Sequence, residues 1–124
     1  MARRDMMSPV KRLIPIGLAV AAATLPQPSF AAGAADFALV NGTGAPISGV
    51  AIRRTTTTAW KQIPAAPSPG ARQQVQFTDP DCAFDIRATL AGIGEVVWSG
   101  VNLCGTKAVI LNRNGTGVLW VDYE

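Results

Sequence analysis

Apolar and polar residues alternate with a period of two along much of the chain after Asp36, and this pattern constrains the fold more than any other feature. Over 82–90, one side of the pattern consists of Cys82, Phe84, Ile86, Ala88 and Leu90. The other side contains Asp85, Arg87 and Thr89. Because successive side chains of a strand point to opposite faces, this segment is expected to form a strand with one buried face and one solvated face.

Other alternating segments are separated by residues typical of turns, which predicts many short strands and no helix. Strands are expected over 37–41, 47–53, 107–111 and 118–123, and around 75–77 and 96–98. The predicted fold is therefore all-β: a small antiparallel β-sandwich of about seven strands with one disulfide, occupying residues 36–124.

The turns between these strands are rich in Gly and Asn. Gly92-Ile93-Gly94 separates two strands, and Asn114-Gly115 is typical of a type I′ hairpin. The tetrapeptide Asn-Gly-Thr-Gly occurs at 41–44 and again at 114–117. The residues that flank the two copies do not match, so we interpret both as turns and not as an internal repeat.

Residues 1–31 have the organisation of a cleaved signal peptide. A basic start is followed by the apolar stretch 13–25 and then by Pro26 and Pro28. That stretch is too short to cross a bilayer core of about 30 Å as a helix. We expect a periplasmic or secreted protein that has no transmembrane segment after cleavage.

The cleavage site and the export route each have two alternatives. Small residues allow cleavage after Ala31 or after Ala34, and the first choice leaves 32–35 as a short N-terminal extension. The pair Arg3-Arg4 fits a twin-arginine signal, but the usual Ser before the pair and Phe after it are missing. The general secretory route is therefore favoured over the twin-arginine route.

Charge and composition argue against several classes of function. The net charge of +3 comes from the N-terminal segment, because from residue 32 onward seven Lys and Arg balance seven Asp and Glu. A neutral domain is not expected to bind nucleic acid. The chain also has no His, which is the commonest general base and the commonest metal ligand. We expect no enzymatic activity, no cofactor and no metal site.

Cys82 and Cys104 are the only two cysteines, and both lie in the part of the chain that is expected to be exported. Disulfides form and persist in the oxidising compartments outside the cytoplasm. A metal site is the alternative, but two thiolates with no His supply only half of a zinc site. We therefore expect Cys82 and Cys104 to be joined in a structural disulfide.

The segment 55–70 is expected to be an irregular surface connection. It contains four consecutive Thr, then Ala59-Trp60-Lys61, then three Pro residues that prevent a regular strand ladder. Loops on a rigid sandwich often carry binding residues, so Thr57, Thr58, Trp60 and Lys61 form a candidate contact loop. The alternative for Trp60 is that it folds back as a plug over the end of the core.

Two groups of charged residues are interpreted as structural. Asp79 and Asp81 flank Pro80 and are expected to cap backbone N–H groups of a turn, and not to act as an acid and base pair. Asp85 and Arg87 are expected to form ion pairs on the exposed face of their strand, either with each other or with neighbouring strands.

Several motifs resemble a family of small exported bacterial single-disulfide β proteins of unknown function. The matching segments are 37–44, 47–52, the stretch ending in Trp60, the Pro-Gly turn at 69–70, 82–87 and 98–104. Some members of that family carry the labels argininosuccinate lyase or Tat pathway signal protein. A chain of this length with no His cannot assemble the active site of that lyase. The acidic residues that family members have beside the loop Trp are also missing, so that loop has no ligands for calcium.

Two classes of function remain. The first is a non-enzymatic binding or envelope-associated module whose partner is an unknown protein or envelope component. The second is a proteinaceous inhibitor of an envelope or secreted hydrolase. The inhibitor hypothesis requires Trp60 or Lys61 to project as an exposed anchor, whereas the module hypothesis requires a broad apolar patch or an open strand edge.

Overall fold

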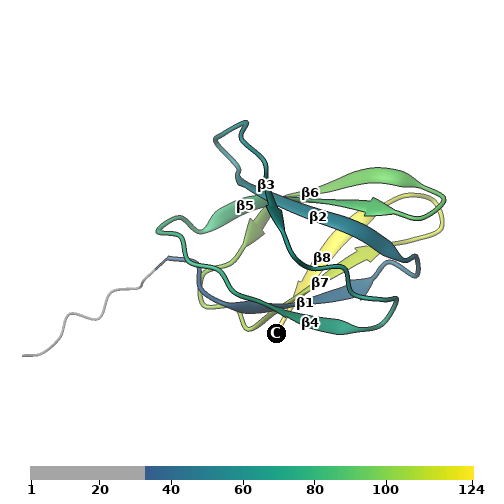
Figure 1. Ribbon diagram of the computed structural model, residues 1–124, viewed down its shortest axis with the longest axis horizontal. Helices are drawn as coiled ribbons and strands as arrows, with labels where there is room; N and C mark the ends of the chain where they lie inside the picture. Colours follow the sequence, from purple (N-terminus) through teal and green to yellow (C-terminus); the bar gives the residue numbers. More distant parts are fainter. Residues whose placement is uncertain (1–32) are drawn as a thin grey trace, which may run out of the picture. The chain divides into compact units, whose positions relative to one another are not determined.

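Eight β-strands form the regular structure of residues 33–124, which are the residues that this computed structural model describes. The strands are β1 (Phe37–Gly42), β2 (Ile47–Arg54), β3 (Lys61–Ile63), β4 (Arg72–Val75), β5 (Ala83–Leu90), β6 (Gly94–Asn102), β7 (Ala108–Arg113) and β8 (Leu119–Tyr123). They form two four-stranded sheets with the orders β4-β1-β7-β8 and β3-β2-β5-β6 (Figure 1). The predicted signal peptide, with its cleavage site after Ala31, lies outside the described residues.

The predicted all-β sandwich with one disulfide is confirmed, with three differences in detail. The strand expected around 75–77 covers Arg72–Val75 instead. One additional strand, β3, forms within the segment expected to be irregular, and it ends at Ile63 just before Pro64. In addition, β1 pairs with β7 in parallel. Hairpin turns impose antiparallel pairing only on strands that follow each other in the chain, and β1 and β7 are separated by five other strands.

The core lies between the two sheets and follows the predicted alternation. Its largest fully buried side chains include Phe37 and Leu39 from β1, Phe84 and Ile86 from β5, and Leu111 from β7. Ala88 and Leu90 are buried with them, as expected. Cys82 is the exception on the predicted inner face, because it precedes the strand and is exposed.

Asp85 was expected on the solvated face but is buried, with only 3% of its surface exposed. The pairing between β5 and β6 shifts between Phe84 and Ile86, which marks a bulge beside Asp85. Because of this bulge the N–H of Gly100 donates to Asp85 Oδ1 at 3.1 Å, while Arg53 Nε donates to Asp85 Oδ2 at 3.0 Å. Burial raises the pKa of Asp85, but the hydrogen bonds outweigh this effect and the pKa is lowered. The prediction that Asp85 pairs with a neighbouring strand is confirmed.

The disulfide between Cys82 and Cys104 is confirmed. It joins the residue before β5 to the connection between β6 and β7, with Cα atoms 5.0 Å apart. The N–H of Leu103 also donates to the carbonyl of Cys82 at 2.9 Å. Since β5 and β7 belong to different sheets, the bridge fixes the position at which the chain leaves one sheet for the other.

The two Asn-Gly-Thr-Gly segments are both turns with the same local hydrogen bonds. Asn41 Oδ1 accepts from the N–H and the hydroxyl of Thr43, and Asn114 Oδ1 accepts from the N–H and the hydroxyl of Thr116. The prediction of a type I′ turn at Asn114-Gly115 is wrong. A type I′ turn needs positive φ at both central residues, whereas the glycine of this segment with positive φ is Gly117. The two Asn residues differ in burial: Asn41 is fully buried and its Nδ2 also donates to the carbonyls of Ala45 and Pro67.

This difference makes the two asparagines a matched pair for mutation. Asn41→Ala is expected to lower the free energy of unfolding by about 2 kcal/mol, because the buried carbonyl of Pro67 loses its donor. Asn114→Ala removes the same turn contacts at an exposed site where water replaces them, so about 0.5 kcal/mol is expected. Urea melts of both variants measure the difference. Equal losses would show that only the turn contacts matter.

Candidate functional site

The candidate contact loop projects from the body of the sandwich between β2 and β3 (Figure 1). Thr57 and Thr58 are exposed there. The N–H and the hydroxyl of Thr57 both donate to the carbonyl of Arg54, which closes the turn at the base of the loop. Thr57 therefore shapes the loop, while Thr58 lies at its exposed part.

Trp60 lies at the end of this loop against the outer face of the sheet that contains β2 and β5. The guanidinium carbons of Arg53 and Arg87 lie 4.4 and 4.5 Å from the centre of its ring. Trp60 is half-buried and is not part of the core cluster. Its position therefore matches neither a plug over the core nor a freely projecting anchor, because cation–π contacts fix the ring on the sheet.

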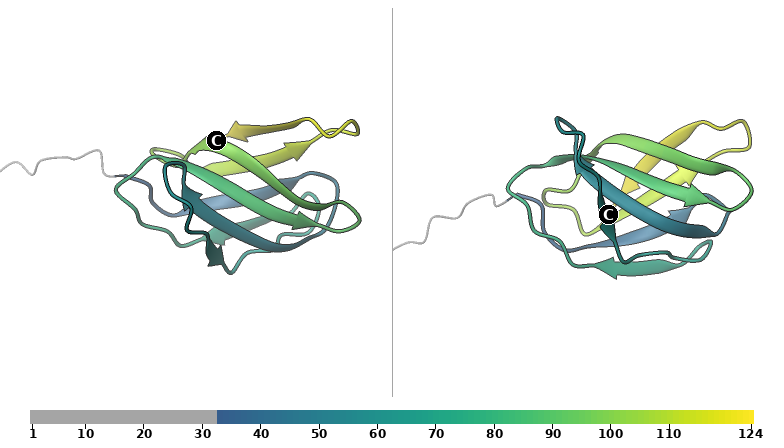
Figure 2. Two further views of the ribbon diagram at one scale, coloured as in Figure 1. Left: turned by 90° about the horizontal axis from the view of Figure 1, so that it is seen from above. Right: turned by 45° about the horizontal axis from the view of Figure 1, so that its top comes forward.

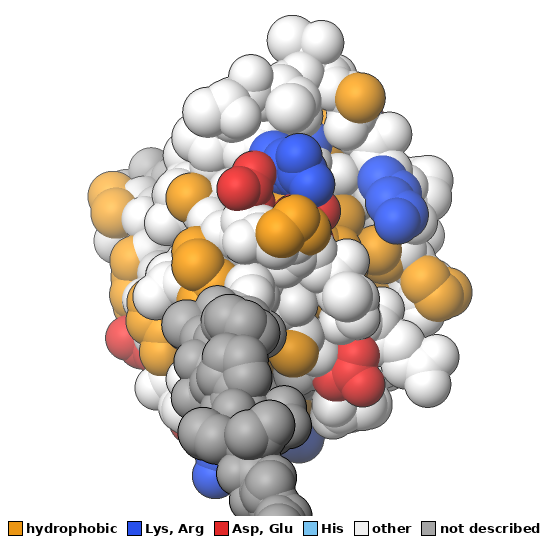
Figure 3. Space-filling model, turned by 90° about the vertical axis from the view of Figure 1, so that its left-hand side faces the viewer, with side chains coloured by type: hydrophobic (Ala, Val, Ile, Leu, Met, Phe, Trp, Pro, Cys, Tyr) orange, Lys and Arg blue, Asp and Glu red, His pale blue; other side chains and the backbone are white. Residues whose placement is uncertain are grey.

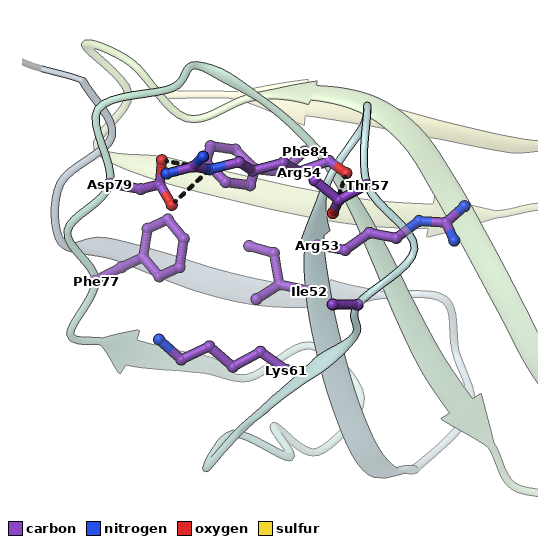
Figure 4. Close-up of a pocket in the computed structure, with 9 residues that line it drawn as sticks. Ile52, Arg53, Arg54, Thr57, Lys61, Phe77, Asp79 and Phe84 are labelled. Carbon is purple, nitrogen blue, oxygen red and sulfur yellow. Dashed lines mark hydrogen bonds and ion pairs between the residues drawn. The ribbon is translucent and has the colours of Figure 1, made fainter.

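A hollow of about 260 Å³ lies beneath the same loop. Its lining includes Thr57 and Lys61 from the candidate contact loop, and Figure 4 shows Phe77, Phe84 and Ile52 along it. Figure 3 shows this end of the molecule from the left-hand side of Figure 1, with Lys, Arg, Asp and Glu side chains gathered around hydrophobic ones. The hollow thus combines apolar and charged groups that come from distant parts of the chain.

Among the charged residues that line the hollow, Arg54 is paired with carboxylates. Arg54 Nε lies 3.1 Å from Asp79 Oδ1 and 3.3 Å from Asp81 Oδ2, and the dashed lines of Figure 4 mark the contact with Asp79. Burial raises the pKa of Asp79, but the N–H of Asp81 and the guanidinium of Arg54 donate to its carboxylate and lower the pKa overall. The prediction that Asp79 caps a turn is confirmed by the Asp81 N–H, which donates to Asp79 Oδ1 at 2.8 Å.

A second surface was not singled out from the sequence. Within residues 33–124, every large hydrophobic side chain that is exposed lies on or beside β6 and β8: Ile93, Val97, Val118, Trp120 and Tyr123. A groove of about 350 Å³ runs between these strands and is lined by Val97, Trp98, Ser99, Leu119, Trp120, Val121 and Tyr123. We call this surface the β6–β8 face.

Both strands of the β6–β8 face are at the edges of their sheets, since each pairs with a single neighbour (Figure 2). The other two edges, β3 and β4, lie at the opposite side and are joined by the connection 64–71. Gln73 holds that connection by donating to the carbonyl of Pro64 and accepting from the N–H of Ala66, both at 3.0 Å. The edges of β3 and β4 are thus covered by the connection 64–71 of the same chain.

The sequence could indicate that 118–123 is a strand but not that it is an edge. The exposed aromatic residues Trp120 and Tyr123 are the signal that could have pointed to this surface, with 42% and 47% of their surfaces exposed. In an alternating strand, aromatic residues on both faces are unusual unless something other than the core covers them.

The described residues contain no group of three or more His, Cys, Asp or Glu side chains placed to hold a metal ion. Over the same residues, no helix is long and apolar enough to span a bilayer.

Comparison with known proteins identifies a related fold but no family. No family model and no curated protein matches the chain. A solved structure that it resembles is the NMR structure of a protein from Eubacterium rectale, with 10% identity and a TM-score of 0.52. The match covers 78% of this chain and 94% of that chain. At this identity the likeness concerns the fold alone.

Proposed function

We propose that the chain is an exported, non-enzymatic binding module whose β6–β8 face docks a protein or envelope component. The observation that carries this proposal is the concentration of exposed apolar side chains on two open strand edges. Large apolar side chains that are exposed close together, and not singly, are typical of interaction sites. Aromatic residues such as Trp120 and Tyr123 are also enriched in the centres of such interfaces.

The alternative, an inhibitor of an envelope or secreted hydrolase, is less well supported. It requires an anchor that projects into the active site of the target, and Trp60 is stacked on Arg53 and Arg87. Lys61 is exposed but lines the hollow beneath the loop. The candidate contact loop therefore offers no large apolar side chain to a partner.

Two observations support export to the periplasm or beyond. The disulfide is typical of an oxidising compartment, and the motifs around Cys82 and Cys104 resemble a family of small exported proteins. Ala34 is buried and pairs with Asp79 in an isolated bridge. Cleavage after Ala31 preserves this bridge, whereas cleavage after Ala34 removes it, so we propose the first site.

Site-specific photo-cross-linking in the producing cell tests which surface binds. The photo-reactive amino acid p-benzoylphenylalanine is placed at position 120 of the full chain, and at position 58 in a control chain. Both positions are exposed, but only Trp120 belongs to the β6–β8 face. We expect a defined adduct from position 120 and none from position 58.

Two other cross-linking results would contradict this expectation. Adducts from position 58 alone would assign binding to the candidate contact loop and would favour the inhibitor. The absence of adducts from both positions in irradiated cells would contradict the proposal of a docking module.

A further inference from the structure

The free edge of β8 presents three residues whose backbone groups point away from β7. Ala108 and Glu124 exchange both backbone hydrogen bonds, at 3.0 and 3.3 Å, and the N–H of Asn114 donates to the carbonyl of Val118 at 3.0 Å. Bonded pairs alternate along an antiparallel ladder, so Trp120 and Asp122 also bond to β7. The N–H and carbonyl groups of Leu119, Val121 and Tyr123 therefore face the open edge.

The edge of β8 lacks Pro, Lys and a bulge, which usually prevent strand addition, and β6 approaches it only at the Tyr123 end, where the N–H of Asn102 donates to the hydroxyl of Tyr123 at 3.1 Å. Its sequence from Leu119 to Tyr123 has neither Pro nor Lys, and its pairing with β7 has no register shift. The other edges differ. β3 carries Lys61 and shares a covering connection with β4, and the pairing of β6 with β5 contains a bulge that increases the local twist.

Charge and side-chain pattern define the segment that would fit this edge. The charged side chains of β6 and β8 are both acidic: Glu95, which lies 4.0 Å from Arg87 Nε, and Asp122, whose Oδ2 accepts from Asn112 Nδ2. Leu119 and Val121 are half-buried and line the groove beside the open edge. A strand placed there has one face over an apolar groove and its ends near carboxylates, so alternating apolar and basic residues complement it.

We propose that β8 accepts an extended, basic segment of a partner protein as an additional strand of the β4-β1-β7-β8 sheet. This inference rests on the proposed function, because it names how the β6–β8 face would engage its partner. A second copy of this chain fits less well, since joining two β8 edges would bring two acidic strands together.

The test uses the oxidised protein isolated from the producing cell and a labelled ten-residue peptide in which Val alternates with Lys and Thr. A second peptide carries Glu in place of each Lys. We expect the basic peptide to bind and the acidic one to bind at least about tenfold more weakly. Hydrogen exchange followed by NMR should show slower exchange at the N–H groups of Leu119, Val121 and Tyr123 on addition of the basic peptide.

Two variants at one position separate the backbone from the side chain. Val121→Pro removes the free N–H and leaves the bonds to β7 intact, so it should weaken peptide binding about tenfold. Val121→Ala keeps the N–H and shortens the side chain, so it should weaken binding less than Val121→Pro. If Val121→Pro fails to fold, hydrogen exchange in the unchanged protein still shows whether the peptide pairs with the backbone of β8.

The outcomes distinguish this inference from the proposed function. Cross-links from position 120 together with no protection of β8 by either peptide would retain the docking face and overturn strand addition. Protection at β6 in place of β8, or protection that rises with protein concentration in the absence of peptide, would overturn it in favour of another edge or of a second copy. Equal binding of the two peptides would also contradict it.

Discussion

Trp98→Ala is expected to lower the free energy of unfolding by about 3 to 5 kcal/mol, the usual range for a large aromatic residue removed from a core. The side chain is 2% exposed and belongs to the core cluster between the sheets. Its Nε1 also donates to the carbonyl of Asn112 on β7 at 2.9 Å. Trp98 thus connects β6 of one sheet to β7 of the other by packing and by a hydrogen bond.

A matched set of variants separates these contributions. Trp98→Phe keeps most of the ring and removes the donor, so about 0.5 to 1.5 kcal/mol of loss is expected, the usual net contribution of one hydrogen bond, because the carbonyl of Asn112 keeps its ladder bond to β8. Trp120→Ala removes the same side chain from an exposed site and should change stability by about 1 kcal/mol or less. Denaturant melts of the oxidised proteins measure the loss of unfolding free energy in each variant. A Trp120→Ala variant as unstable as Trp98→Ala would mean that the β6–β8 face is structural and not a docking surface.

The period-two pattern predicted the fold class and much of the core, because one buried face imposes its own register. Phe84 and Ile86 are buried as their positions in the pattern require. Asp85 is buried although the pattern places it on the solvated face, because a bulge in β6 supplies its carboxylate with a backbone donor. A bulge depends on the pairing of two strands, and a single strand does not reveal it.

The candidate site was less predictable than the fold for a similar reason. Trp60 was expected either as a contact residue or as a plug over the core, but its surroundings depend on Arg53 and Arg87 from two strands outside the loop. The β6–β8 face was missed because whether a strand is an edge depends on strand order. Among the described strands β8 pairs with β7 alone, and no local signal in 118–123 reports that arrangement.

Replacing both cysteines, as Cys82→Ser with Cys104→Ser, is expected to lower the free energy of unfolding by about 2 to 5 kcal/mol. The bridge closes a loop with a sequence separation of 22, for which loss of chain entropy in the unfolded state corresponds to about 3 kcal/mol. Cys82 is exposed and Cys104 is half-buried, so serine at these positions leaves no large cavity. The expected loss therefore arises chiefly from the unfolded chain and not from packing.

This origin gives the prediction a specific control. The unchanged protein treated with reductant should match the double serine variant in stability, because both lack the cross-link and keep the same core. The slope of the unfolding free energy against urea concentration should rise in both, since an unfolded chain without the bridge exposes more surface. The intact mass of the unchanged protein should be lower by two hydrogen atoms without reductant than after reduction. If the double variant and the oxidised protein unfold at the same urea concentration with the same slope, the β-sheet ladders alone constrain this region and the bridge adds nothing to stability.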